Sequence, residues 1–200
     1  MKYGKRLREE IERTFPEWKG QFISYKKLKK QLKLINPRSK ANNIIYRRWP
    51  RFATRRFLQV NNMRLIIGFT RLLDNELKKV NTFYVDKEED YIIRLKELQI
   101  RAANLEDDEE EIKLKVQKDI LNFHGEMVLL LNYSVLNFTG LIKIVKKHNK
   151  RTGKKFEFTS MPKAKAMQQP FFSTDLLYKL MKECEAMLGP LFLPREDAPL

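Results

Sequence analysis

Two long runs of apolar residues at helical spacing constrain what this chain can fold into. Each run steps by three, four or seven residues, the spacing of one α-helix face rather than the alternation of a β-strand. Strand patterns are nearly absent from the 200 residues. Two long helices packed against each other would bury both runs. The first run is Leu73, Leu77, Val80, Tyr84, Tyr91, Leu95 and Leu98, and the second is Ile112, Val116, Ile120, Phe123, Met127 and Leu130.

An acidic segment separates the two runs. Residues 106–111 are six consecutive Glu and Asp residues, which are too highly charged to be packed in a core. We place them at the elbow of a long antiparallel hairpin, where carboxylates favour the start of the following helix. That second long helix is expected to continue through Gly140 to about Lys150, with Gly153 as a left-handed cap.

Shorter helices are expected on either side of this hairpin. A helix from about Lys2 to Thr14 and a second one beginning near Ser24 form an N-terminal helical hairpin. A last amphipathic helix follows Ser173 and ends near Leu188. The predicted fold is therefore all-α, with the N-terminal helical hairpin packed on two long antiparallel helices and with short C-terminal helices.

One domain is expected, because 200 residues with 42% hydrophobic content suit a single core. Its core covers residues 1–165, a C-terminal helical extension covers 166–192, and 193–200 form a tail. A basic linker of uncertain structure is expected over about 39–70. Within it, the segment Tyr46–Phe57 interleaves aromatic residues with arginine, which is typical either of nucleic-acid or anionic-membrane contact or of a solvated linker.

The positive charge is concentrated at the N-terminal end. The formal net charge is +16, and residues 1–80 hold 22 Lys/Arg against 6 Asp/Glu, whereas residues 81–200 hold 19 of each. Such a field attracts polyanions in a salt-dependent way. The single cysteine, Cys184, excludes an internal disulfide and fits a reducing interior. No run of 18 apolar residues exists, so we expect no membrane span.

Two lysine-rich segments, Tyr25–Lys33 and Leu141–Lys150, each place lysines on one helical face and apolar residues on another. Like charges four residues apart repel by a few tenths of a kcal/mol, which a bound anion would relieve. Tyr25 and Lys29 are one turn apart, so a hydroxyl and an ammonium can converge on one phosphate. The alternative is a solvated lysine face. The candidate anion-binding residues are Tyr25, Lys26, Lys29, Lys143, Lys146, Lys147 and Lys150, of which Lys143, Lys147 and Lys150 share a helical face.

The sequence offers little for catalysis. Two histidines, one cysteine and no clustered acids outside the elbow give no zinc site or nucleophile triad, and no glycine-rich phosphate loop is present. His124 and His148 lie beside apolar stripes and are interpreted as structural. We therefore expect no enzyme, no metal and no cofactor.

Several motifs together carry a family resemblance. The motifs are Met1-Lys2-Tyr3-Gly4-Lys5, Pro16-Glu17-Trp18, Tyr25 to Lys30, Phe123 to Leu130, Asn137 to Gly153, and Gln168-Gln169-Pro170-Phe171-Phe172. They resemble the SPX domain, a eukaryotic module that senses inositol polyphosphates, and in particular the stand-alone SPX proteins of plants. The resemblance covers about residues 1–38 and 73–192, and the family usually has Asp where Asn149 stands.

This resemblance implies a nutrient sensor that is not an enzyme. Its ligand would be an inositol pyrophosphate or inositol hexakisphosphate. Tyr25, Lys29 and one lysine of the second segment would hold one phosphate, while Lys2 and the remaining lysines of that segment hold others. The loaded protein would bind and inhibit a MYB-type coiled-coil transcription factor of phosphate starvation, in nucleus and cytoplasm, with no direct DNA contact required.

Two other functions stay open at this point. The chain could be the regulatory SPX module of a phosphate transporter or a polyphosphate polymerase. From another class, it could be a basic helical nucleic-acid-binding protein. Competition binding separates these classes, because any duplex DNA should displace the ligand from a nucleic-acid-binding protein, whereas only more highly phosphorylated inositols should displace it from a sensor.

Overall fold

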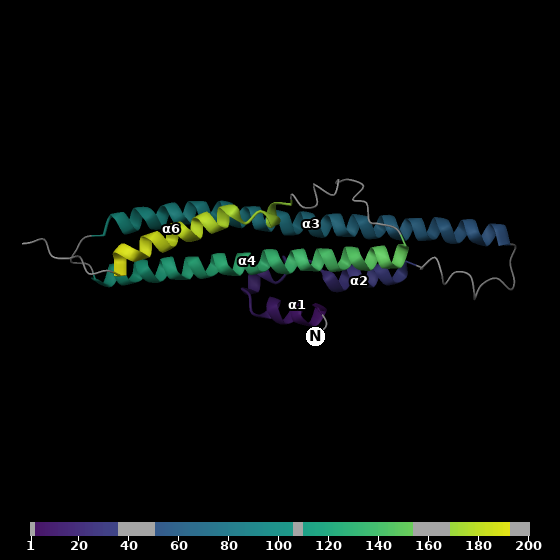
Figure 1. Cartoon of the computed structure of the whole chain (residues 1–200), viewed down its shortest axis with the longest axis horizontal. Coiled ribbons are helices and arrows are strands. Elements are labelled where there is room, and N and C mark those ends of the chain that lie inside the picture. The colour runs from purple at the N-terminus through teal and green to yellow at the C-terminus, as the bar shows by residue number, and fades with distance from the viewer. Residues whose placement is uncertain (1–2, 36–50, 106–109, 154–168, 193–200) are drawn as a thin grey trace, which may run out of the picture. The chain divides into compact units, whose positions relative to one another are not determined.

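The regular secondary structure is helical throughout the part of the chain that this computed structural model describes, which is residues 3–35, 51–105, 110–153 and 169–192. Figure 1 shows these helices. The predicted all-α fold, with an N-terminal helical hairpin on two long antiparallel helices, is confirmed. The elements are α1 (Tyr3–Glu12), η1 (Pro16–Trp18), α2 (Tyr25–Leu34), α3 (Arg51–Ala103), α4 (Glu110–Thr152), η2 (Pro170–Phe172) and α6 (Asp175–Phe192).

Helix α3 begins much earlier than its predicted apolar run. It starts at Arg51, so residues 51–70 of the expected linker are helical, while 39–50 lie outside the described residues. Phe69 is fully buried and stacks on His148 with the ring centroids 5.2 Å apart. Packing of this kind stabilises a helical segment more than intrinsic propensity does. The apolar spacing of Phe69 and Leu73 was therefore the overlooked sign that the helix continues towards the N-terminus.

Helix α4 is as long as the sequence indicates. It runs from Glu110 through Gly140 to Thr152, and Glu110 and Glu111 occupy its first turn. Gly153 has a φ angle of 67° and donates its N–H to Asn149 O at 3.0 Å. The left-handed glycine cap is thus present, because only glycine adopts this φ without a Cβ penalty. Residues 106–109 of the acidic elbow lie outside the described residues.

The helices form two compact units. Unit 1 comprises Met1–Asn81 and Val135–Gln169, and within it α1 and α2 lie against the C-terminal part of α4 (Figure 1). The backbone N–H of Ile23 donates to the buried Asn137 Oδ1 at 2.7 Å, and Tyr3 Oη donates to Leu136 O at 2.7 Å. These two bonds join the N-terminal hairpin to one turn of α4. The core of the unit contains Trp18, Phe22, Leu28, Leu32, Ile35, Phe69, Leu73, Leu141 and Ile144.

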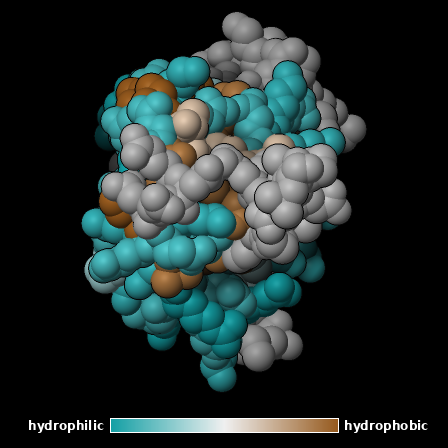
Figure 2. Space-filling view, turned by 90° about the vertical axis from the view of Figure 1, so that its left-hand side faces the viewer, coloured by the Kyte–Doolittle hydropathy of each residue, from teal (hydrophilic) through white to brown (hydrophobic). Residues whose placement is uncertain are grey.

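Unit 2 comprises Thr82–Ser134 and Pro170–Leu200. Here α3 and α4 are antiparallel, with Arg94 Nη1 2.8 Å from Glu126 Oε1, and α6 covers them. The Tyr91 and Phe123 rings meet edge to face in its core. Figure 2 looks onto the side where α6 and the neighbouring ends of α3 and α4 lie, and shows hydrophobic residues in brown among hydrophilic ones in teal.

Among the described helices, α4 alone is long and apolar enough to cross a membrane by composition. Its most apolar 18-residue stretch has a mean hydropathy of 1.6, and 44% of that stretch is buried inside the protein. A core helix has the same composition. The length and composition of α4 are therefore weak evidence for a membrane span.

Substitution of Gly140 tests the packing of α1 on α4. A Cβ at this buried position would lie 2.9 Å from both Tyr3 Oη and Ile23 Cγ2, which is closer than real Cβ atoms approach. We expect Gly140→Ala to lower the free energy of unfolding by about 1–3 kcal/mol, because the two side chains must move out of a packed core. Urea unfolding followed by circular dichroism measures the change.

Gly125 provides the matched control on the same helix. It is exposed and has nothing within 4 Å of an added Cβ. Gly125→Ala should raise stability by about 1 kcal/mol through helix propensity alone. If both substitutions stabilise the protein, the contact between Tyr3 and Gly140 does not exist in solution.

Candidate anion-binding site

Helix α2 presents its lysines because its apolar stripe fixes the rotation of the helix. Leu28 and Leu32 are buried, and Tyr25 is only 7% exposed. The side chains of Lys26 and Lys29 are exposed on the remaining surface. On α4, the buried Leu141 and Ile144 fix the rotation in the same manner. Lys143, Lys146, Lys147 and Lys150 are all exposed on that helix.

Tyr3 brings predicted residues of both segments together. Its ring packs edge to face on Tyr25 with the centroids 4.9 Å apart, and Lys143 Nζ lies 5.4 Å from the centre of the same ring. An ammonium over an aromatic face is attracted by the ring quadrupole. Tyr3 thus joins α1, α2 and α4 at one point in unit 1. Tyr3 was not among the site residues predicted from the sequence, although a glycine in the interior of a helix, Gly140, was the sign that another group approaches closely there.

The hydroxyl of Tyr25 is a hydrogen-bond donor at neutral pH. Burial raises the pKa of Tyr25 above its ordinary value of 10, because the phenolate would be poorly solvated. Burial, and then the neighbouring Tyr25, raise the pKa of Tyr3 as well. Both rings therefore stay neutral, and lysine supplies the charge at this site.

Arg151 connects the ends of the two lysine-bearing helices. Its guanidinium, on the last turn of α4, donates from Nη2 to Lys33 O at 2.7 Å and from Nε to Ile35 O. These carbonyls belong to the C-terminal end of α2, where helix carbonyls lack intrahelical partners. Arg151 therefore caps α2 and holds it beside the α4 turn that carries Lys147 and Lys150.

A buried carboxylate fixes the other end of α2. Glu76 Oε2 accepts the backbone N–H of Ser24 at 3.0 Å and pairs with Lys79 Nζ at 2.7 Å, while Lys79 also donates to Phe22 O at 2.8 Å. Burial alone would raise the pKa of Glu76. The bonds from Lys79 and Ser24 outweigh burial and hold the pKa of Glu76 below its ordinary value.

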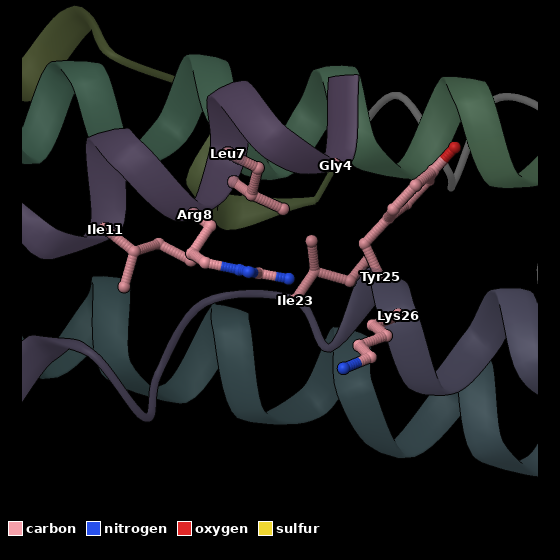
Figure 3. A pocket seen from close by; sticks show the side chains of 7 residues that line it. All are labelled: Gly4, Leu7, Arg8, Ile11, Ile23, Tyr25 and Lys26. Atoms are coloured by element: carbon pink, nitrogen blue, oxygen red, sulfur yellow. The ribbon is translucent and has the colours of Figure 1, made fainter. Parts of the chain in front are cut away.

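Lys26 and Tyr25 both line a cavity of about 190 Å³ between α1 and the start of α2. Figure 3 shows that Arg8 extends across the cavity and that Leu7, Ile11 and Ile23 form its apolar walls. These walls do not suit a polyphosphate. We infer that the anion site is the open lysine surface beside Tyr25, while Lys2 lies outside the described residues.

The remaining titratable groups singled out from the sequence are structural. His148 is buried against Phe69, with Nδ1 3.4 Å from Asn149 Oδ1. His124 Nε2 lies 3.2 Å from Glu185 Oε1. Cys184 is buried, and burial raises the pKa of its thiol to about 12. Within the described ranges, no group of three His, Cys, Asp or Glu side chains is placed to hold a metal ion.

Comparison with known proteins gives a consistent result. Residues 1–51 match the family model for the SPX domain. The chain is 48% identical to SPX domain-containing protein 1 of Arabidopsis thaliana, over 98% of this chain and 73% of that protein. It is also 48% identical to SPX domain-containing protein 1 of Oryza sativa subsp. japonica, over 98% of this chain and 67% of the relative.

A solved structure is similar along almost the whole chain. It is the SPX domain of glycerophosphodiester phosphodiesterase 1 of Chaetomium thermophilum in complex with inositol hexakisphosphate. The two structures align with a TM-score of 0.72 and 26% sequence identity, covering 96% of this chain and 99% of the other.

The lowered pKa of Glu76 predicts a pH-dependent contribution to stability. A carboxyl whose folded pKa lies below its unfolded pKa stabilises the fold above the unfolded value and loses this contribution as pH falls through the folded value. We expect Glu76→Gln to reduce the free energy of unfolding by about 1.5–3 kcal/mol at pH 7. In urea titrations from pH 7 to pH 3, the difference from wild type should stay constant well above the ordinary glutamate pKa of 4.5 and shrink as pH falls below it.

Glu9→Gln is the control for this measurement. Glu9 pairs with Lys5 on the exposed surface of α1 at 3.7 Å. Exposed pairs contribute less than about 1 kcal/mol, so this variant should differ little from wild type at any pH. An effect of Glu76→Gln that stayed constant across the pH range would contradict the assigned pKa.

Proposed function

This chain belongs to the SPX domain family, and we propose that it senses inositol phosphates in phosphate homeostasis and acts as a regulator rather than an enzyme. The convergence of Tyr25 and Lys143 on Tyr3 carries this proposal, because it joins the two lysine segments in one unit. The family member bound to inositol hexakisphosphate supports the ligand class. Similarity to plant SPX proteins over 98% of the chain favours this function over that of a transporter or polymerase module.

The chemistry of the site favours a densely phosphorylated ligand. An ammonium on a flexible stem can adapt to a crowded ring of phosphates. Four or five charge-assisted contacts at about 1.5–3 kcal/mol each give roughly 6–15 kcal/mol before costs. Ordering the lysine side chains and restricting the ligand offset several kcal/mol, which leaves affinities near micromolar. Orthophosphate has too little charge to engage α2 and α4 together, so an inositol pyrophosphate or hexakisphosphate fits best.

The regulated partner is proposed to be a MYB-type coiled-coil transcription factor, which the loaded protein binds and inhibits in nucleus and cytoplasm. A ligand that contacts lysines of both α2 and α4 replaces their mutual repulsion with shared contacts. It would thereby hold the two helices in the arrangement that a partner recognises. Linkage requires that the partner tighten ligand binding by the same factor as the ligand tightens partner binding.

Calorimetry with inositol hexakisphosphate tests the site directly. Lys29→Ala should weaken binding about tenfold or more, because it removes a charge-assisted contact worth about 1.5–3 kcal/mol. Tyr25→Phe should weaken binding less, since the phenol supplies one neutral hydrogen bond. Lys147→Ala should resemble Lys29→Ala.

Lys182→Ala is the matched control, because Lys182 is an exposed lysine on α6 in unit 2. Lys182→Ala lowers the net charge by the same amount as Lys29→Ala and should leave the affinity for inositol hexakisphosphate almost unchanged. Equal losses for Lys182→Ala and Lys29→Ala would mean that only the overall charge attracts the ligand.

The coupling to a partner is tested with the triple variant Lys143→Ala/Lys147→Ala/Lys150→Ala. We expect wild type to bind the coiled-coil region of a plant MYB-type coiled-coil factor 5- to 150-fold more tightly with inositol hexakisphosphate present, the usual range of allosteric coupling. The triple variant should lose this dependence but keep its helix content, because alanine favours helix. Surface plasmon resonance with and without ligand measures the affinity of each protein for the coiled-coil region. Ligand-dependent binding by the triple variant would place the sensing site elsewhere.

A further inference from the structure

Helix α3 has an outward-facing apolar stripe in unit 1 that the ligand site does not use. Val60, Met63 and Ile67 are 53%, 52% and 45% exposed. They are three and four residues apart, so they lie on one face of the helix. Exposed apolar residues gathered on one face, unlike scattered ones, mark an interaction site.

This stripe is separate from the packed face of α3. Phe69 follows Ile67 by two residues, which corresponds to a rotation of about 200° around a helix with 3.6 residues per turn. Phe69 is fully buried against His148. Helix α3 therefore has an apolar face in the core and a second one on the opposite side, where a surface helix normally presents polar residues.

Helix α2 adds a fourth apolar side chain. Ser24 bonds to Glu76, and a Cβ on Gly68 would lie 3.5 Å from Gln31 Nε2, so α2 runs antiparallel along α3. Leu34 is one turn beyond Gln31 on the same side of α2 and is 57% exposed. We call Leu34, Val60, Met63 and Ile67 the α2/α3 strip.

The charge around the α2/α3 strip has one sign. Among the residues whose side chains the structure describes on either side, 18–35 and 60–73 contain eight Lys and Arg and no Asp or Glu. Lys27 and Lys30 on α2, and Arg64 and Arg71 on α3, are exposed beside the strip. A complementary surface must therefore be apolar along its centre and acidic at its edges.

We propose that the α2/α3 strip is the docking surface for an acidic amphipathic helix of a partner protein. Val60, Met63 and Ile67 follow the a, d, a spacing of a coiled-coil seam, with β-branched residues at both a positions. A second copy of this chain would bring like charges together. The strip is one side chain wide, which suits a helix better than the broad apolar face of a lipid-binding helix.

The docking surface adds a binding site for the partner to the proposed function. It rests on the proposed function in one respect, which is that the ligand controls binding of the partner. Helix α2 carries Lys29 for the ligand and, on its other flank, Lys27, Lys30 and Leu34 for the partner. A ligand that fixes α2 against α4 would also fix Leu34 beside α3. The same rigid helix would thus transmit occupancy of one site to the other.

The test uses the full chain and two synthetic helical peptides of about four heptads, with Leu at a and d and either Glu or Lys at e and g. Fluorescence anisotropy should show binding of the Glu peptide and none of the Lys peptide. Met63→Ser/Ile67→Ser should weaken binding of the Glu peptide about tenfold or more, since it removes buried apolar contacts. Arg64→Glu/Arg71→Glu should reverse the preference between the two peptides.

Ile93→Ser/Ile100→Ser is the matched control, because Ile93 and Ile100 are exposed on the same helix in unit 2. It should bind the Glu peptide as wild type does. Equal weakening in both double variants, or absence of binding in wild type, overturns the proposal.

Other occupants of the strip would give different results. The docking proposal is overturned if sedimentation shows self-association that depends on Met63. It is also overturned if the peptide fails to bind while the protein binds vesicles containing phosphatidylserine and loses that binding in Met63→Ser/Ile67→Ser. Calorimetry with inositol hexakisphosphate on the same variants keeps the two proposals distinguishable. The strip variants should retain their affinity for inositol hexakisphosphate. Loss of peptide binding together with intact ligand binding therefore supports the docking surface. Absence of ligand binding in wild type would refute only the sensor proposal.

Discussion

The hydrogen bond between Ile23 N–H and Asn137 Oδ1 is the interaction on which the rest of unit 1 depends. It is buried and joins residues 114 positions apart in sequence. A buried amide N–H without a partner costs free energy comparable to a lost hydrogen bond, so this bond selects one placement of the N-terminal hairpin on α4. One helical turn further, Gly140 leaves the space that Tyr3 and Ile23 occupy. The proposed sharing of one ligand by the lysines of α2 and α4 depends on this turn, because it fixes both segments.

Three polar contacts then oppose the repulsion between the lysine-bearing helices. Glu76 binds the start of α2, Arg151 binds its end, and Tyr3 places its ring beneath Lys143. The contacts at the two ends of α2 satisfy backbone groups, and the Tyr3 ring attracts the exposed ammonium of Lys143. Together they limit the movement of α2 relative to α4. A bound polyanion that removes the repulsion between the lysines would restrict this movement further, and that further restriction is what a partner would sense.

The two flanks of α2 give the sensor proposal its physical basis. Tyr25 and Lys29 belong to the flank beside α1 and α4, whereas Gln31 meets Gly68 of α3 on the other flank. A short rigid helix cannot adjust one flank independently of the other. A ligand that restricts the movement of α2 on one flank would therefore restrict the other flank as well. A partner that binds this restricted position would then be coupled to the ligand.

The sequence by itself determined the helical class, the start of α2, the extent of α4, the glycine cap at Gly153 and the lysine-rich faces, because these follow from local periodicity and charge. It placed the start of α3 too late, since residues 51–70 carry the arginine and aromatic composition of a solvated segment, and the burial of Phe69 against His148 is a long-range contact. Only the tertiary structure brought Tyr3, Tyr25 and Lys143 together and placed Tyr25 and Lys26 at the cavity between α1 and α2. The physical reason is that helical periodicity fixes which face of a helix is buried, whereas packing between segments more than a hundred residues apart decides which exposed faces meet.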